Sequence, residues 1–245
     1  VDLQNGKSEE RTGSNRYVGV PGMNAICKHI AANLTVQTQT RITSLTRDTK
    51  WTVASEEESF GDFDAVVVAI PAVQAAELLS GVSKLADTIA KVEMTPCWTT
   101  MLAFETPIDV SFDAALVHDS AIAWMARNSS KPSRPASTDG WVVQASAEWS
   151  KGNLERDAAD VAAELLAEFL RLVEHPLRVP THNVAHRWRY AFAAAPLGAE
   201  SLLDRELSLA ICGDWCLGNR VEHAFLSGLS AAEATSRCIG VRPRG

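Results

Sequence analysis

One stretch near the C-terminal end brings together glycines, a carboxylate and the start of a helix in a spacing that suits a bound ligand. Gly213 and Asp214 follow a short apolar run, and a helical pattern begins near Arg220 with Val221 and Glu222. Glycine lets the backbone approach a ligand, aspartate accepts hydrogen bonds from hydroxyls, and a helix N-terminus presents unpaired N–H groups. The stretch therefore predicts a site for a phosphate or an electron-rich ring. Taken alone, the Gly-Asp pair is equally compatible with a plain turn.

The spacing of apolar residues predicts an α/β layer around this stretch. Residues 64–70 form a continuous apolar run closed by Pro71, which is typical of a strand buried on both faces of a parallel sheet. Helices are expected at 72–79 and 83–92, and residues 207–211 return to the same sheet. Upstream, we expect a helix at 25–33 and strands at 34–39, 41–47 and 51–55.

A second pattern, between residues 96 and 204, predicts a largely antiparallel sheet covered by a helix. The helix is expected at 157–173, where apolar residues recur at helical spacing. The expected strands are 97–104, 115–118, 121–127, 141–147 and 179–190. The fold class is thus α/β: a Rossmann-like nucleotide-binding layer (17–80 plus 205–240) with an inserted α+β domain (81–204). Ligands of such discontinuous domains bind at the interface.

Bulk composition excludes several other classes of protein. The 245 residues are 46% hydrophobic and 22% charged, as in a soluble globular protein, and the net charge of −7 argues against broad binding to nucleic acid or anionic membranes. No apolar run approaches the roughly 20 residues that span a bilayer. Five scattered cysteines indicate free thiols in a reducing cytoplasm, and Cys212 and Cys216 lack the further ligands of a metal site.

The C-terminal stretch resembles the flavin-contacting motif of FAD-dependent oxidoreductases of the amine-oxidase and renalase-like group. The shared pattern is Gly-Asp, a short loop, Val-Glu, Ala, Ser-Gly and Ala-Ala. The resemblance implies that Gly213 and Asp214 contact FAD. It also implies that the N–H of Val221 faces the pyrimidine end of the flavin, where negative charge develops on reduction. Glu222 either shares this contact or complements the helix N-terminus.

The resemblance extends upstream through residues 40–45, 51–53 and 64–71. In the family, the backbone at the position of Ile42 touches the adenine, and Ala69 and Ile70 lie near the dinucleotide. The roles that the resemblance implies for these three residues are backbone contacts with the cofactor. Plain sheet is the alternative for both segments.

Residues 122–132, 149–150 and 186–191 are similar to those of bacterial NAD/FAD-dependent oxidoreductases related to renalase, so the resemblance covers nearly the whole chain from 17 to 234. It implies that Trp124 and Trp188 line the flavin face as aromatic walls. His186 is a candidate acid or base. Hydride transfer to flavin needs no strong base, so a structural role is the alternative for the histidine, as core packing is for the tryptophans.

Four arginines are candidate ligands of an anionic substrate, because guanidinium groups pair well with phosphate and carboxylate. They are Arg127, Arg187, Arg189 and Arg220. Arg220 stands where monoamine oxidases place an aromatic wall, and an arginine there repels a protonated amine. The alternative for the others is a solvated sheet edge.

Two absences from the sequence also bear on the cofactor. No cysteine lies near residues 188–200 to attach a flavin covalently, so the expected FAD is non-covalent. The strand, Gly-x-Gly-x-x-Gly turn and helix that open this family are not found either, so the N-terminal βαβ unit is missing. We expect its absence to expose a sheet edge and apolar surface.

The function expected from the resemblance is hydride transfer from a small dihydronicotinamide-type substrate to flavin N5, with electrons passed on to O2. An anionic substrate of this type is a candidate, because of the four arginines. One alternative is an amine or amino-acid oxidase on the same scaffold. Another is a non-catalytic remnant that acts as an interaction module. The sequence leaves the oligomeric state open.

Overall fold

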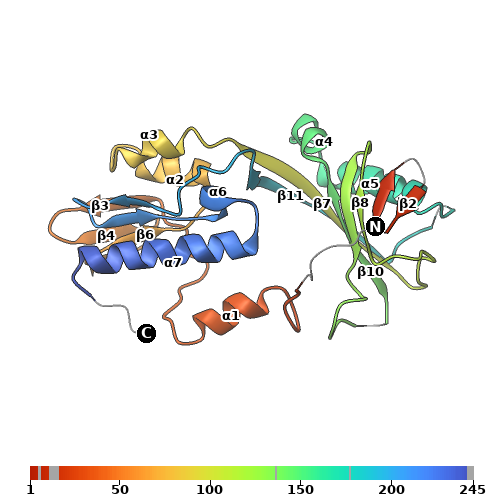
Figure 1. Cartoon of the computed structure of the whole chain (residues 1–245), viewed down its shortest axis with the longest axis horizontal. Helices are drawn as coiled ribbons and strands as arrows, with labels where there is room; N and C mark the ends of the chain where they lie inside the picture. The colour runs from red at the N-terminus through yellow and green to blue at the C-terminus, as the bar shows by residue number, and fades with distance from the viewer. Residues whose placement is uncertain (5–6, 11–16, 136, 177, 242–245) are drawn as a thin grey trace. The chain divides into compact units, whose positions relative to one another are not determined.

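The computed structural model describes residues 1–4, 7–10, 17–135, 137–176 and 178–241 (Figure 1). They fall into two compact units, and the chain passes between the units three times. The first unit comprises Val1–Val36 and Pro96–Arg189, and the second comprises Gln37–Thr95 and Tyr190–Gly245. Both segments of each unit are therefore needed to complete it.

The first unit is built on a seven-stranded mixed sheet with the order β11-β7-β10-β9-β8-β1-β2. β1 pairs in parallel with β8, and the registers between β7, β10, β9 and β8 are antiparallel. The strands are β1 (Asp2–Gln4), β2 (Lys7–Glu9), β7 (Met94–Phe104), β8 (Ala114–Val117), β9 (Ile122–Arg127), β10 (Asp139–Ala145) and β11 (His182–Ala193). The helices are α1 (Ala25–Ala31), α4 (Ala147–Gly152) and α5 (Ala158–Leu172).

Helix α5 covers one face of this sheet because its apolar residues recur every three to four positions. Val161, Leu165 and Phe169 are fully buried against the sheet residues Phe104 and Trp141. The ring of Phe169 lies 5.2 Å from that of Trp141. The helix starts where the Asp157 side chain accepts a hydrogen bond from the N–H of Ala159, at 2.8 Å. The opposite face of the sheet carries other side chains, among them Thr99, Trp124 and Gln144.

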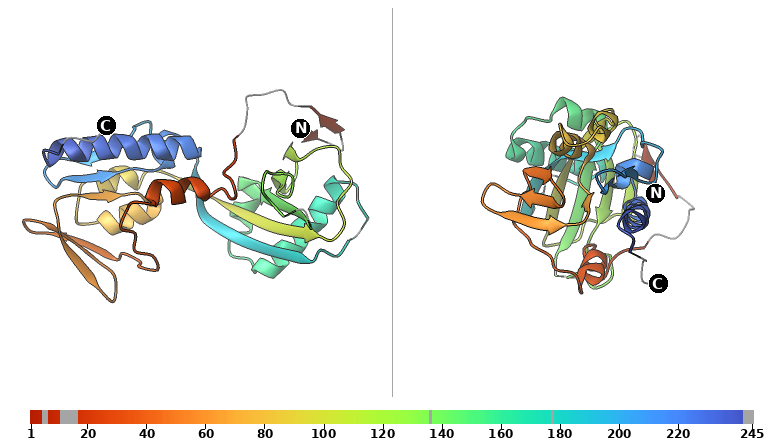
Figure 2. Two further views of the ribbon diagram at one scale, coloured as in Figure 1. Left: turned by 90° about the horizontal axis from the view of Figure 1, so that it is seen from below. Right: turned by 90° about the vertical axis from the view of Figure 1, so that its left-hand side faces the viewer.

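The second unit contains two three-stranded sheets, ordered β12-β13-β6 and β3-β4-β5. β6 and β13 pair in parallel, and helices α7 and α2 lie on opposite sides of that sheet (Figure 2). The strands are β3 (Ser44–Arg47), β4 (Trp51–Ala54), β5 (Ser59–Phe63), β6 (Val66–Val68), β12 (Leu202–Asp204) and β13 (Leu209–Ile211). The helices are α2 (Ala72–Leu79), α3 (Leu85–Ile89), α6 (Asp214–Leu217) and α7 (Val221–Cys238).

Strand β6 has an open edge within the described part of the chain. At its edges, β6 pairs with β13 on one side and with no described strand on the other. On its faces, the sequence predicts burial on both sides, and the structure differs. Val68 is 5% exposed, whereas Val67 is 44% and Ile70 is 37% exposed. An exposed sheet edge and apolar surface agree with the expectation from the sequence.

Replacing Val67 by lysine is expected to lower the self-association of this chain. An exposed apolar edge strand invites pairing with another chain, and a lysine disfavours that pairing. Sedimentation at increasing protein concentration measures the effect. Glu58→Lys, at the exposed β4–β5 turn, is the control for added positive charge. An equal fall in both variants would assign the effect to net charge and contradict a role of the edge.

Several predicted boundaries were wrong. Residues 34–39 form no strand, and the strand expected at 41–47 starts at Ser44. Alternating Thr and Val suits a sheet, but this segment has no strand to pair with. The compact units group 17–36 with the first unit and 81–95 and 190–204 with the second, and the domain limits expected from the sequence stay a prediction. Helix α3 explains part of this: it packs on α2, so Ile89 joins the same core as Leu79.

None of the described helices is both long enough and apolar enough to cross a membrane.

Candidate functional site

The turn after β13 brings the backbone at Gly213 against an indole ring. The indole N–H of Trp215 donates to the carbonyl of Ile70 at 3.1 Å, and the N–H of Gly213 donates to Ser227 Oγ at 3.1 Å. A Cβ added at Gly213 would lie 2.4 Å from Trp215 Nε1. Only glycine therefore fits at this position. Asp214 begins α6, where its Oδ1 accepts from the N–H of Trp215 at 2.9 Å.

A second glycine lies at the end of α6 and packs against a histidine. Gly218 has φ 150°, and a Cβ there would lie 2.6 Å from His223 Nδ1. This Nδ1 atom is buried and has no hydrogen-bond partner within the described residues. The neighbouring Asn219 fixes the loop, because its amide bonds both the N–H and the carbonyl of Ala193 at 3.0 Å. The turn anchored by Asn219 thus leaves the buried Nδ1 of His223 without a hydrogen-bond partner among the described residues.

Helix α7 begins beside this turn with an uncapped N-terminus. Arg220 occupies the N-cap position, and no side chain of the described residues caps the first turn. Val221 is 67% exposed and Glu222 is exposed. The first N–H groups of an 18-residue helix are therefore available to a ligand with partial negative charge. The sequence predicted a helix start near Arg220, and α7 begins at Val221.

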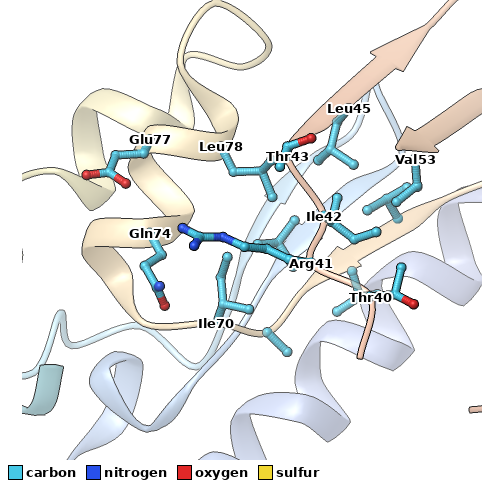
Figure 3. A pocket seen from close by; sticks show the side chains of 14 residues that line it. Thr40, Arg41, Ile42, Thr43, Leu45, Val53, Ile70, Gln74, Glu77 and Leu78 are labelled. Carbon is cyan, nitrogen blue, oxygen red and sulfur yellow. The ribbon is translucent and has the colours of Figure 1, made fainter. Parts of the chain in front are cut away.

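A cavity of about 510 Å³ brings together the other three predicted cofactor residues (Figure 3). Ile42, Ala69 and Ile70 all line it. Apolar residues of β6 and of the β3–β4 hairpin form part of the wall, and Arg41, Gln74 and Glu77 supply polar groups. Ile70 also links the cavity to the turn, since its carbonyl accepts from Trp215.

These features fit a bound flavin dinucleotide. The buried Nδ1 of His223 lacks a partner, the first turn of α7 is uncapped, and the cavity is large and mainly apolar. Gly213, Asp214, Val221, Glu222 and the three cavity residues would hold the cofactor. The individual contacts stay predictions. His223 was missed because a histidine in a helix gives no sequence signal of burial.

The cysteines of this turn are inert thiols. Burial raises the pKa of both Cys212 and Cys216 above the ordinary thiol value, so both stay protonated at neutral pH. Among the described residues, no group of three or more His, Cys, Asp or Glu side chains is arranged to hold a metal ion.

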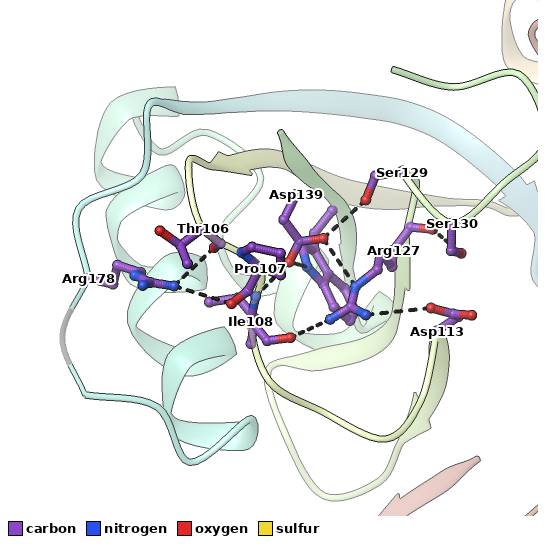
Figure 4. A network of polar contacts seen from close by, with 10 residues as sticks. Thr106, Pro107, Ile108, Asp113, Arg127, Ser129, Ser130, Asp139 and Arg178 are labelled. Carbon is purple, nitrogen blue, oxygen red and sulfur yellow. Dashed lines mark hydrogen bonds and ion pairs between the residues drawn. The ribbon is translucent and has the colours of Figure 1, made fainter. Parts of the chain in front are cut away.

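In the first unit, Arg127 belongs to a network of polar contacts around a buried carboxylate (Figure 4). Asp139 is 4% exposed and accepts from the N–H of Ile108 at 2.8 Å and from the indole of Trp141 at 2.9 Å. Arg127 Nε lies 3.1 Å from Asp139 Oδ1, and the guanidinium stacks 4.8 Å from the Trp141 ring. It also donates to the Ile108 carbonyl. Arg127 is therefore engaged by protein groups.

Arg187 and Arg189 also have a protein partner. Both bond the carboxylate of Glu155, at 2.8 Å and 2.7 Å respectively. The hydrogen bond from Arg189 is the main cause that lowers the pKa of Glu155. Arg187 additionally donates to the carbonyl of Leu154 at 2.7 Å. That an anion binds to these arginines stays a prediction, and Arg220 belongs to the second unit.

The predicted aromatic residues lie together on the sheet face opposite α5. Gln144 of β10 is paired with Thr99 of β7 on one side and with Trp124 of β9 on the other. Met101 lies two residues after Thr99 on β7, on the same face. His186 and Trp188 extend from β11 on the same face, because the alternate residue Ala185 points into the core under α5. The two rings pack edge to face with centroids 4.5 Å apart. We call this set the aromatic face: Thr99, Met101, Trp124, Gln144, His186 and Trp188.

An uncapped helix N-terminus behind a Gly-Asp turn, in a mixed α/β fold, suits a ligand that carries phosphate groups. Residues 4–235 match the family described as flavin containing amine oxidoreductase, and the chain belongs to this family, whose cofactor is FAD. The fold is similar to that of a candidate protoporphyrinogen oxidase from Exiguobacterium sp. 255-15, with a TM-score of 0.68, 12% identity, and coverage of 89% of this chain and 50% of that one.

Two solved amine oxidases have similar folds. Cyclohexylamine oxidase from Brevibacterium oxydans IH-35A gives a TM-score of 0.66 at 12% identity, covering 89% of this chain and 52% of that one. A redesigned single-substitution variant of putrescine oxidase gives 0.61 at 14% identity, with 89% and 53% covered. The chain thus spans about half the length of these neighbours.

Proposed function

We propose that the protein containing this chain is an FAD-dependent oxidoreductase that takes a hydride from a small dihydronicotinamide-type substrate. FAD, held without a covalent link, would supply the hydride acceptor at N5 and the onward route of the electrons to O2. The chain's own residues position the ring, and the N–H groups of α7 favour the charge that reduction creates. Its location in the cytoplasm is part of the same proposal.

The observation that carries this proposal is the turn at Gly213 beside the uncapped start of α7. The Gly213 N–H is bonded to Ser227, and the Asn219 side chain is bonded to Ala193, so the turn is anchored on both sides. The uncapped N–H groups of the first turn of α7 are therefore oriented before any ligand arrives. Preorganised donors stabilise developing negative charge at no cost in reorganisation. Positioning of this kind suits hydride transfer, which needs no strong acid or base from the protein.

A spectrum tests the cofactor, and turnover tests the substrate. The chain, and the longer gene product if there is one, are purified with added FAD and their visible absorption is recorded after desalting. We expect protein-bound flavin that a dihydronicotinamide compound bleaches under nitrogen and that air restores. A protein with no bound flavin in either form would contradict the proposal and favour a non-catalytic interaction module.

An amine or amino-acid oxidase is the second candidate. The family description and the two amine oxidases of similar fold favour it. Arg220 is the residue of this chain that argues against it, since a guanidinium repels a protonated amine. Anaerobic bleaching of the flavin by primary amines, with no response to dihydronicotinamides, would establish this candidate in place of the first.

A further inference from the structure

We infer that the aromatic face selects an uncharged, flat ring that carries an amide or a similar neutral hydrogen-bonding group. This inference rests on the proposed function, and it names the part of the substrate that the first unit recognises. Anionic groups of the substrate make no contact with this face.

The first step of the argument is the make-up of the aromatic face. Trp188 is 54% and Met101 is 37% exposed, and Gln144 is exposed. Trp124 is half-buried beside Gln144, its cross-strand partner. An antiparallel sheet that turns one face to water normally carries polar side chains there. A face with two indoles and a thioether instead suits stacking with a flat apolar ring.

The second step concerns charge. On the described residues of β7, β9, β10 and β11 that form this face, there is no Asp, Glu, Lys or Arg. Along the row of Trp124, Leu116 of β8 comes next and Asp2 of β1 follows it, and the carboxylate of Asp2 pairs with His118 at 3.3 Å. A protonated amine stripped of water here would have no carboxylate partner, and attraction to an indole offsets only part of that loss.

The third step is the position of the arginines. Arg127 shares its sheet row with Trp141 and Leu102, which belong to the core under α5. Arg187 follows the same side of β11 as Ala185 and reaches Leu154. Both guanidinium groups therefore lie across the sheet from Trp124. On its described strands, the aromatic face therefore offers an anion no guanidinium or ammonium group, and the imidazole of His186 packs edge to face against Trp188.

The fourth step is the amide of Gln144. Within the described residues this amide has no hydrogen-bond partner, and it lies between Thr99 and Trp124. A carboxamide offers both a donor and an acceptor, so it can pair with a neutral amide of a ring stacked on Trp124. One exposed amide between an indole and a hydroxyl gives the face its hydrogen-bonding specificity.

Three probes with one ring and different charges test the inference. Benzamide, benzylammonium and benzoate are titrated calorimetrically into the flavin-loaded protein. We expect benzamide to bind at least about tenfold more tightly than either charged probe, because the face has no carboxylate for the ammonium group and no lysine or arginine for the carboxylate. Tighter binding of benzylammonium or benzoate than of benzamide would overturn the inference.

A second test of the inference introduces a negative charge on the aromatic face. Gln144→Glu is expected to strengthen benzylammonium binding by about tenfold and weaken benzamide binding, because it supplies the missing carboxylate. Gln37→Glu makes the same change on the exposed loop of the second unit and is expected to alter neither. Equal effects of both variants would overturn the inference. A protein without flavin that keeps the benzamide preference would contradict the proposed function alone.

Discussion

Gly213→Ala is expected to destabilise the protein by about 1–3 kcal/mol, because overpacking a filled site forces buried groups to shift. The added methyl would lie 2.4 Å from an indole that is 1% exposed and hydrogen-bonded to Ile70, so the ring cannot move without losing that bond. Because the same turn orients the predicted flavin donors, FAD affinity should fall at least about tenfold as well. Urea unfolding and flavin retention on desalting measure the two effects.

Gly228→Ala is the matched control for this substitution. Gly228 lies in α7 with nothing within 4 Å of an added Cβ. Alanine in place of glycine inside a helix is worth about 0.5–1 kcal/mol of added stability. A Gly213→Ala protein as stable as wild type and still yellow would show that the close approach at Gly213 does not position the cofactor.

Asp139→Ala is expected to have the largest effect on stability, a loss of about 3–5 kcal/mol, because it leaves a mostly buried guanidinium uncompensated. The side chain of Arg127 is 18% exposed, and Asp139 also accepts from Ile108 and Trp141. Removing the carboxylate strands two buried N–H donors as well as the charge. The free energy of unfolding in urea is the measurement.

Asp113→Ala removes the other carboxylate near Arg127 and serves as the control. Asp113 is 64% exposed and 3.7 Å from the guanidinium, so its loss should cost no more than about 1 kcal/mol. Equal losses in the two variants would mean that Asp139 acts as an ordinary surface charge.

The start of α7 and the residues around the Gly-Asp turn could be predicted from the sequence because their signal is local. A glycine pair and a change of period mark a strand, a turn and a helix within a few residues. Ile42, Ala69 and Ile70 came from resemblance, and the structure places them in one cavity. Their shared location follows from the pairing of distant strands, which no local pattern encodes.

The arginines show what the sequence could not decide. Alternate residues of a strand point to opposite faces, so Arg187 and Trp188 must separate once the strand forms. The sequence contains that alternation, but it does not say which face the helix will cover. Asp139 was missed for a related reason, since a carboxylate at a strand start is ordinarily exposed and only the fold supplies its buried partners.

The point where the chain leaves the second unit and returns to it has a consequence for how such proteins can be rebuilt. The N–H of Ala194 donates to the Glu93 carbonyl at 2.8 Å, and Thr95 Oγ1 donates to the Phe192 carbonyl at 3.0 Å. These bonds lie within the second unit, so that unit holds its own two ends together. Residues 96–189 form the first unit together with residues 1–36, so both segments would be removed together. A short turn from 95 to 190 is then expected to close the second unit at little entropic cost, and a foreign segment could be grafted between the same two residues.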